Sequence, residues 1–70
     1  MAGSVYKVIA LVGTCTESWE KAATAAVNLA SQSLRDLRIA EVTTLDMQLE
    51  DGKVAKYRAK VKVSFKFEGS

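Results

Sequence analysis

The segment KYRAKVKVSFKF, residues 56–67, decides the fold because it alternates between two kinds of residue without interruption. Side chains on a β-strand point to opposite faces in turn. One face carries the apolar and aromatic residues, which are Tyr57, Ala59, Val61, Val63, Phe65 and Phe67. The other face carries Lys56, Arg58, Lys60, Lys62, Ser64 and Lys66. The segment therefore predicts a strand with one buried face and one strongly basic face.

The rest of the chain predicts two more strands and one helix. Residues 5–13, VYKVIALVG, are rich in β-branched residues and end at a glycine, which favours a first strand. From Trp19 onward, apolar residues recur at steps of three and four, which is the spacing of one helix face. They are Trp19, Ala23, Ala26, Val27, Ala30 and Leu34. Residues 39–49 return to a strand pattern before the basic strand.

The ends of the helix carry the expected signals. Thr16 or Ser18 is the predicted N-cap, because a short hydroxyl side chain can accept a hydrogen bond from a free N–H of the first turn. Glu17 and Glu20 are expected in the first turn and Arg35 in the last, where their charges suit the helix dipole.

The second strand changes phase, because its apolar residues are even-numbered up to Val42 and odd-numbered from Leu45. A β-bulge near Thr43-Thr44 would reconcile the two halves. A three-residue loop, Glu50-Asp51-Gly52, is then predicted between the second strand and the basic strand, with Gly52 in the left-handed region. This loop sets the pairing register of the two strands. It pairs Leu45 with Tyr57 and Asp46 with Lys56.

These elements predict an α+β fold of β-α-β-β topology, with residues 1–70 forming a single domain. The strand–helix–strand crossover leaves the outer two strands parallel, and the third strand fits between them antiparallel to both, in the order 1-3-2. One helix covers only one face of such a sheet. The basic face is left uncovered, and Glu41, Asp46 and Glu50 are the expected counter-charges.

Self-association is expected to stabilise so small a domain. A chain of 70 residues buries only about 60% of the surface that its unfolded form exposes. Cys15 is the only cysteine and histidine is absent, so an intrachain disulfide and the usual zinc sites are excluded. The single cysteine, without a signal sequence, favours the cytoplasm.

Several functions are disfavoured. Sheet-based nucleic-acid binding requires aromatic rings beside the cations, whereas Tyr57, Phe65 and Phe67 lie on the opposite face of the basic strand. No histidine, P-loop or nucleophile motif indicates an enzyme. Residues 5–13 are too short to cross a membrane and contain Lys7. No catalytic residue, nucleic-acid partner or membrane partner is predicted.

Four segments of the chain, in this order and spacing, form a recognisable pattern: Val5–Thr14, Ser18–Ala23, Leu37–Val42 and Tyr57–Glu68. Through them the chain resembles the dodecin family. The resemblance implies a hollow homododecamer of cubic symmetry. It also implies a non-catalytic storage role, in which flavins such as riboflavin, FMN and FAD are bound as stacked pairs at subunit interfaces and sequestered from photochemistry.

Two residues depart from the flavin-binding pattern that the resemblance implies. Ile39 stands where such dodecins place a tryptophan that stacks on the flavin ring, and Arg58 stands where they place a glutamine that bonds its pyrimidine edge. Ile39 could give an apolar wall and Arg58 could stack or donate to the ring. Flavin binding through Ile39 and Arg58 is the first functional prediction, and it is expected to be weak.

SWEKAA, IAEV and YRAKVKVSFKF resemble a subgroup known as calcium dodecins. The resemblance implies that a divalent cation, calcium, replaces flavin, with Asp46, Glu50 and Asp51 as plausible oxygen donors. A structural oligomer without a small ligand is the third alternative.

Overall fold

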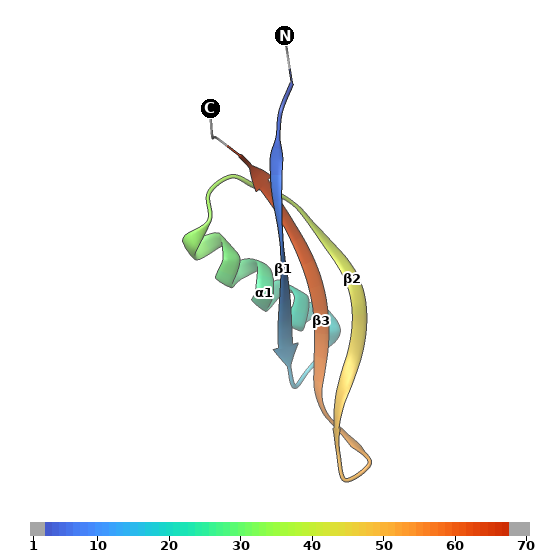
Figure 1. The fold of residues 1–70 in the computed structure, drawn as a ribbon. Helices are drawn as coiled ribbons and strands as arrows, with labels where there is room; N and C mark the ends of the chain where they lie inside the picture. The colour runs from blue at the N-terminus through green and yellow to red at the C-terminus, as the bar shows by residue number, and fades with distance from the viewer. Residues whose placement is uncertain (1–2, 68–70) are drawn as a thin grey trace.

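The computed structural model describes residues 3–67, and these form one helix beside one three-stranded sheet (Figure 1). The elements in chain order are β1 (Tyr6–Cys15), α1 (Trp19–Ser33), β2 (Leu37–Glu50) and β3 (Lys53–Lys66). The strand order is β1-β3-β2, and β3 is antiparallel to both neighbours. The predicted α+β fold, its β-α-β-β topology and its strand order are confirmed.

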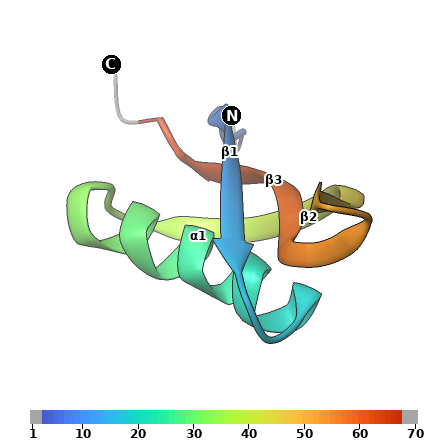
Figure 2. The ribbon, with the colours of Figure 1, turned by 90° about the horizontal axis from the view of Figure 1, so that it is seen from below.

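The helix lies along one side of the sheet and leaves the other side open (Figure 2). Small residues meet at this contact, so the helix lies close to the strands. The buried core joins one stripe of the helix to the odd-numbered face of β3; its members are Ala22, Ala26, Ala30, Ala59, Val61 and Val63. The apolar face predicted for β3 is therefore the one that the helix covers.

Gly13 on β1 sits where the helix comes closest to the sheet. A Cβ atom built on Gly13 would stand 2.0 Å from the carbonyl oxygen of Ala22 and 3.1 Å from the Cβ of Ala26. No side chain fits at this point. The glycine that was expected to end the first strand in fact lies inside β1, which continues to Cys15.

The helix begins as predicted and ends earlier than predicted. Ser18 is the N-cap, and its hydroxyl accepts a hydrogen bond of 3.1 Å from the N–H of Lys21. Glu20 lies in the first turn, whereas Glu17 precedes the cap and forms an ion pair with Lys21. The last turn contains no basic residue, so the placement of Arg35 there was wrong. Leu34 already has extended backbone angles and ends the helix.

A bulge in β2 explains the change of phase in its apolar residues. Val42 pairs with Val61 and Thr44 pairs with Lys60, so Thr43 is the extra residue. The bulge predicted near Thr43-Thr44 is confirmed. It keeps Val42 and Leu45 on the same face of the sheet, the face that carries the helix.

The predicted loop and register between β2 and β3 were wrong. The turn has two residues, Asp51 (φ 51°) and Gly52 (φ 74°), between the paired residues Glu50 and Lys53. Two positive φ values in a two-residue turn are typical of type I′, whose twist suits a hairpin. The left-handed conformation predicted for Gly52 is correct.

A second bulge, on β3, lies next to this turn. Leu49 pairs with Val54 and Gln48 pairs with Lys56, so Ala55 is the extra residue of the bulge. Because the two-residue turn and this bulge each shift the register by one residue, Asp46 lies opposite Arg58 and not Lys56. Leu45 likewise lies opposite Ala59 and not Tyr57.

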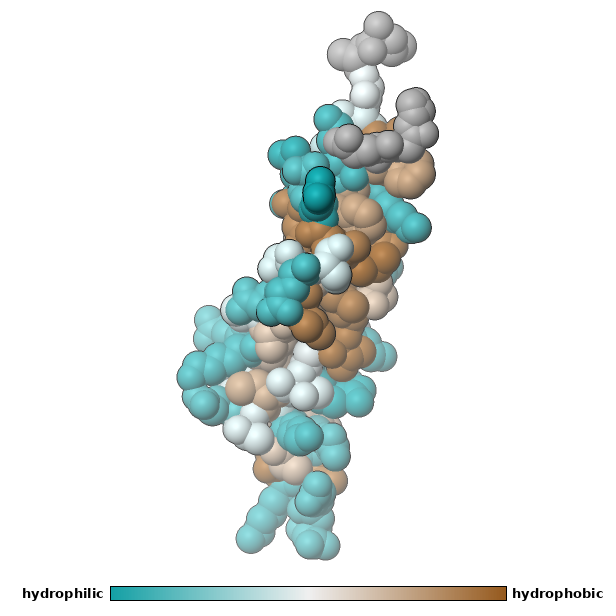
Figure 3. Space-filling model, turned by 90° about the vertical axis from the view of Figure 1, so that its left-hand side faces the viewer, coloured by the Kyte–Doolittle hydropathy of each residue, from teal (hydrophilic) through white to brown (hydrophobic). Residues whose placement is uncertain are grey.

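The folded chain is long and narrow. Its radius of gyration is 14.6 Å, whereas a compact domain of this length is expected to have about 11 Å. The hairpin of β2 and β3 extends well beyond the end of the helix (Figure 1). Seen from the side on which the helix lies in Figure 1, apolar side chains gather in one continuous area (Figure 3). Much apolar surface is therefore left for a neighbour to cover.

Candidate functional site

The open face of the sheet carries several of the residues that the sequence singled out. The basic row of β3 runs along its centre, with Glu41, Thr44, Asp46 and Gln48 of β2 paired to Lys62, Lys60, Arg58 and Lys56. On the other side, β1 contributes Tyr6, Val8, Ala10, Val12 and Thr14, paired to Lys66, Ser64, Lys62, Lys60 and Arg58. The face is thus an apolar stripe, a cationic stripe and a mixed stripe side by side.

Asp46 and Arg58 form a bidentate ion pair on this face. Arg58 donates from Nε to Asp46 Oδ1 at 2.8 Å and from its Nη2 to Asp46 Oδ2 at 3.2 Å. Both side chains are a little over one-third exposed. The hydrogen bond from Arg58 holds the pKa of the Asp46 carboxyl below its ordinary value; partial desolvation opposes the shift, and the charges of Arg58 and Lys60 reinforce it. The same bond raises the pKa of Arg58.

Within residues 3–67, the other cations of the row have no such partner. Between residues 3 and 67, the only ion pairs are Asp46–Arg58 and Glu17–Lys21. Glu41 lies beside Lys62 across the ladder without forming an ion pair. Within the described residues, Asp46 is therefore the one member of the three expected counter-charges that forms an ion pair. Excess positive charge remains along β3.

The two predicted flavin residues share the open face but lie far apart. Ile39 is 67% exposed and pairs with Ser64, whose hydroxyl donates to the Ile39 carbonyl oxygen at 3.4 Å. Arg58 is six positions from Ser64 along β3, a separation of about 20 Å at the usual rise per residue. A single flavin ring cannot touch both residues of one protomer.

The three predicted metal ligands are not gathered either. Asp46 and Glu50 lie four positions apart on β2, which is about 13 Å, and Asp51 lies in the turn. Carboxylate oxygens suit calcium, but calcium takes 6–8 oxygen ligands. Within residues 3–67, no three Asp, Glu, His or Cys side chains come together to hold a metal. The described residues of one protomer thus supply suitable donors without completing a site.

The structure adds contacts that sequence reasoning missed. Tyr6 is 48% exposed on the cationic face, because β1 pairs Tyr6 with Lys66. The alternation of residues 5–13 would have placed Tyr6 on the cationic face once the pairing of β1 with β3 was known. Trp19 donates from Nε1 to the Asp46 carbonyl oxygen at 2.9 Å and packs its ring edge-on against Tyr57 at 5.1 Å. Nothing in the sequence indicated that bond.

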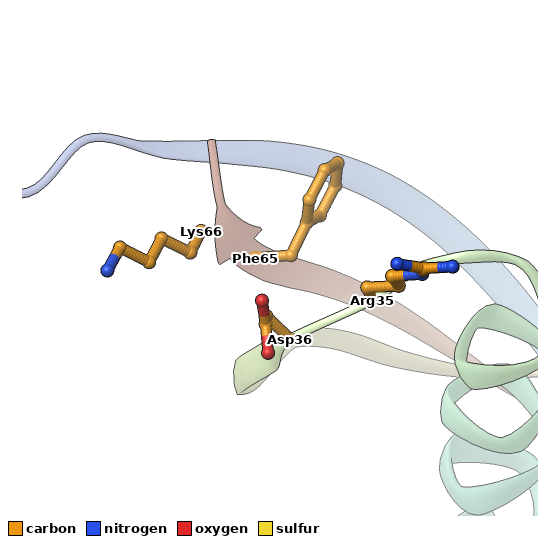
Figure 4. Close-up of a pocket in the computed structure, with 4 residues that line it drawn as sticks. All are labelled: Arg35, Asp36, Phe65 and Lys66. Carbon is orange, nitrogen blue, oxygen red and sulfur yellow. The ribbon is translucent and has the colours of Figure 1, made fainter. Parts of the chain in front are cut away.

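Two depressions lie outside the open face. One is an apolar groove between the start of the helix and β2, lined by Trp19, Glu20, Ala23, Thr24, Val42 and Leu45. The other lies between the end of the helix and the end of β3 and is lined by Arg35, Asp36, Phe65 and Lys66 (Figure 4). In the second, the side chains of Arg35 and Lys66 point away from each other, so the two cations do not converge on one ligand.

Comparison with known proteins assigns the fold to a family. The dodecin family model matches residues 5–68. The chain belongs to the dodecin family. One curated relative, the calcium dodecin of Mycobacterium tuberculosis, is 48% identical over 63 residues, which are 90% of this chain and 89% of that protein.

Solved dodecin structures superpose closely on this chain. The dodecin from Streptomyces coelicolor has a TM-score of 0.91 at 40% identity, with 100% of both chains covered. The calcium dodecin from Mycobacterium tuberculosis, described as a calcium-chelating antigen with a novel calcium-binding site, has a TM-score of 0.84 at 46% identity, with 96% of both chains covered. No helix in the described part of this dodecin is long and apolar enough to span a membrane.

Proposed function

We propose that this dodecin is a non-catalytic binding protein that assembles as a homododecamer and binds calcium between its protomers. The observation that carries the proposal is its 48% identity to a calcium dodecin over nine-tenths of the chain. The exposed apolar surface and elongated shape of the protomer support assembly. The location that we propose is the cytoplasm, as the single Cys15 indicates.

The hairpin tip is the part of the protomer best suited to carry the cation. Glu50 and Asp51 are adjacent, exposed and clear of the helix (Figure 1). Asp46, the third predicted donor, is on the same hairpin but is bonded to Arg58. Because calcium takes 6–8 oxygens, we propose that donors from a second protomer, together with water, complete the site. Assembly and calcium binding are then coupled.

The test is thermal unfolding with calcium, with magnesium and with calcium plus chelator. A ligand that binds the folded state at 100 times its Kd stabilises it by about 2.7 kcal/mol, which raises the Tm. Asp51→Asn is the matched variant, because asparagine also tolerates the left-handed turn but lacks the carboxylate. We expect it to keep the calcium-free Tm and lose much of the calcium response. An unchanged Tm of the unmodified protein in calcium would refute the proposal.

Flavin binding is the second candidate, and the exposure of Ile39 on the open face favours it. Because Ile39 and Arg58 are so far apart in one chain, the ring would lie between Ile39 of one protomer and Arg58 of another. Absence of a stacking aromatic is expected to remove about 0.5–1.5 kcal/mol of binding. Quenching of riboflavin fluorescence by micromolar protein is the measurement, and no quenching would exclude this candidate.

A further inference from the structure

Asp46 is held from both sides of the sheet. On the side of the helix, Trp19 Nε1 donates to its carbonyl oxygen at 2.9 Å. On the open side, Arg58 binds both of its carboxylate oxygens. Trp19 belongs to α1 and Arg58 to β3, so three elements meet at this one residue of β2.

The bond from Trp19 is placed where the helix and β2 would otherwise separate. The helix lies mainly over β1 and β3 and reaches β2 near its first turns. The Trp19 ring also packs edge-on against Tyr57, which pairs with Met47 next to Asp46. These contacts fix the backbone of Asp46 while Arg58 fixes its side chain.

The same arrangement makes Asp46 a poor metal ligand. A cation that binds the carboxylate must compete with the positively charged guanidinium, because each oxygen already accepts a hydrogen bond from Arg58. Two neighbouring lysines on the open face also repel a second cation. Lys56 and Lys60 each lie two positions from Arg58 along β3. Arg58, for its part, commits its Nε and one Nη2 hydrogen to Asp46, which leaves the Nη1 edge of its guanidinium for another acceptor.

We infer that Asp46 is a structural clamp in this dodecin, paired with Arg58 and Trp19, and that it is not one of the calcium ligands. The inference refines the proposed function, because it assigns the calcium donors to the hairpin tip and the partner protomer. The pair thus engages both carboxylate oxygens of Asp46 and one edge of the Arg58 guanidinium on the open face.

The experiment compares Asp46→Asn with Glu41→Gln. Each variant removes one carboxylate charge from the open face of β2, but Glu41 lies beside Lys62 without an ion pair. We expect Asp46→Asn to lower the Tm by several degrees more than Glu41→Gln does. Calorimetric titration should give both variants a calcium Kd within about twofold of the unmodified protein. Loss of calcium binding by an assembled Asp46→Asn protein would overturn the inference, as would equal Tm values of the two variants.

A double-mutant cycle with Arg58→Gln adds a second arm. Because Asp46 and Arg58 act as a pair, the double variant should lose less stability than the two single variants lose together. If Asp46→Asn does not fold, Arg58→Lys keeps the charge but loses the fork geometry, and it should lower the Tm with an unchanged calcium Kd. Additive single losses or a weakened calcium Kd of Arg58→Lys would contradict the clamp. If the unmodified protein binds no calcium, the proposed function fails while the stability measurements still test the clamp.

Discussion

Gly13 is the residue at which the packing of helix on sheet is decided. Because its missing Cβ would overlap the Ala22 carbonyl oxygen, Gly13→Ala must push the helix away from β1. Overpacking of this kind costs about 3 kcal/mol or more when backbone has to move. Denaturant unfolding measures the loss. Gly3→Ala is the control, since nothing lies within 4 Å of its added Cβ; equal losses for the two variants would show that the close approach is not a constraint.

The titration of Asp46 gives a second prediction at the same scale. Its folded-state pKa is lower than its unfolded value, so the unfolded chain binds more protons and the ion pair stabilises the fold above the unfolded pKa. That contribution is lost as the pH falls through the folded pKa. The Tm difference between the unmodified protein and Asp46→Asn should therefore be full above about pH 5 and shrink steadily below it. A difference that does not change with pH would contradict the ion pair.

At the scale of elements, the sequence predicted the strands, the helix and one bulge, because each left a periodic signal. The switch from even to odd apolar positions between Val42 and Leu45 could be read directly, and the bulge at Thr43 is its cause. The bulge at Ala55 gave no such signal, because alanine is neutral on either face. The predicted register was wrong because of this bulge and the shorter turn, and the pairing of Asp46 with Arg58 could not be foreseen.

The hairpin turn offers the prediction for this scale. Gly52 has a φ of 74°, where an L-residue with a Cβ pays about 1–2 kcal/mol. Gly52→Ala should lower the free energy of unfolding by about 1 kcal/mol in calcium-free buffer, because alanine is strained at the positive φ that the type I′ turn requires. Asp51→Asn, which keeps a residue tolerant of positive φ, should cost nothing measurable. Chemical denaturation of both variants measures the free energy of unfolding. An unchanged value for Gly52→Ala would contradict the type I′ turn.

For the whole molecule, the sequence indicated the family and the candidate residues but not how they combine into a site. Ile39 and Arg58 lie about 20 Å apart on one face, and the carboxylates of the hairpin do not converge within the described residues. Our proposal therefore takes the remaining ligands from a second protomer. Single-chain periodicity carries no information about such a neighbour, so the site residues remain predictions.

The apolar surface on the helix side of β2 is where we expect protomers to meet. Val42, Leu45, Met47 and Leu49 are each 45–59% exposed, because the helix covers β1 and β3 instead. Leu45→Lys should leave the protomer folded, since Leu45 is already half exposed, but placing a charge in a buried contact should break the assembly. Native mass spectrometry would then show smaller species, with helical circular dichroism retained. Asn28→Lys, on the exposed face of the helix, adds the same charge and should leave the assembly intact. An intact complex of Leu45→Lys would place the interface elsewhere on the protomer.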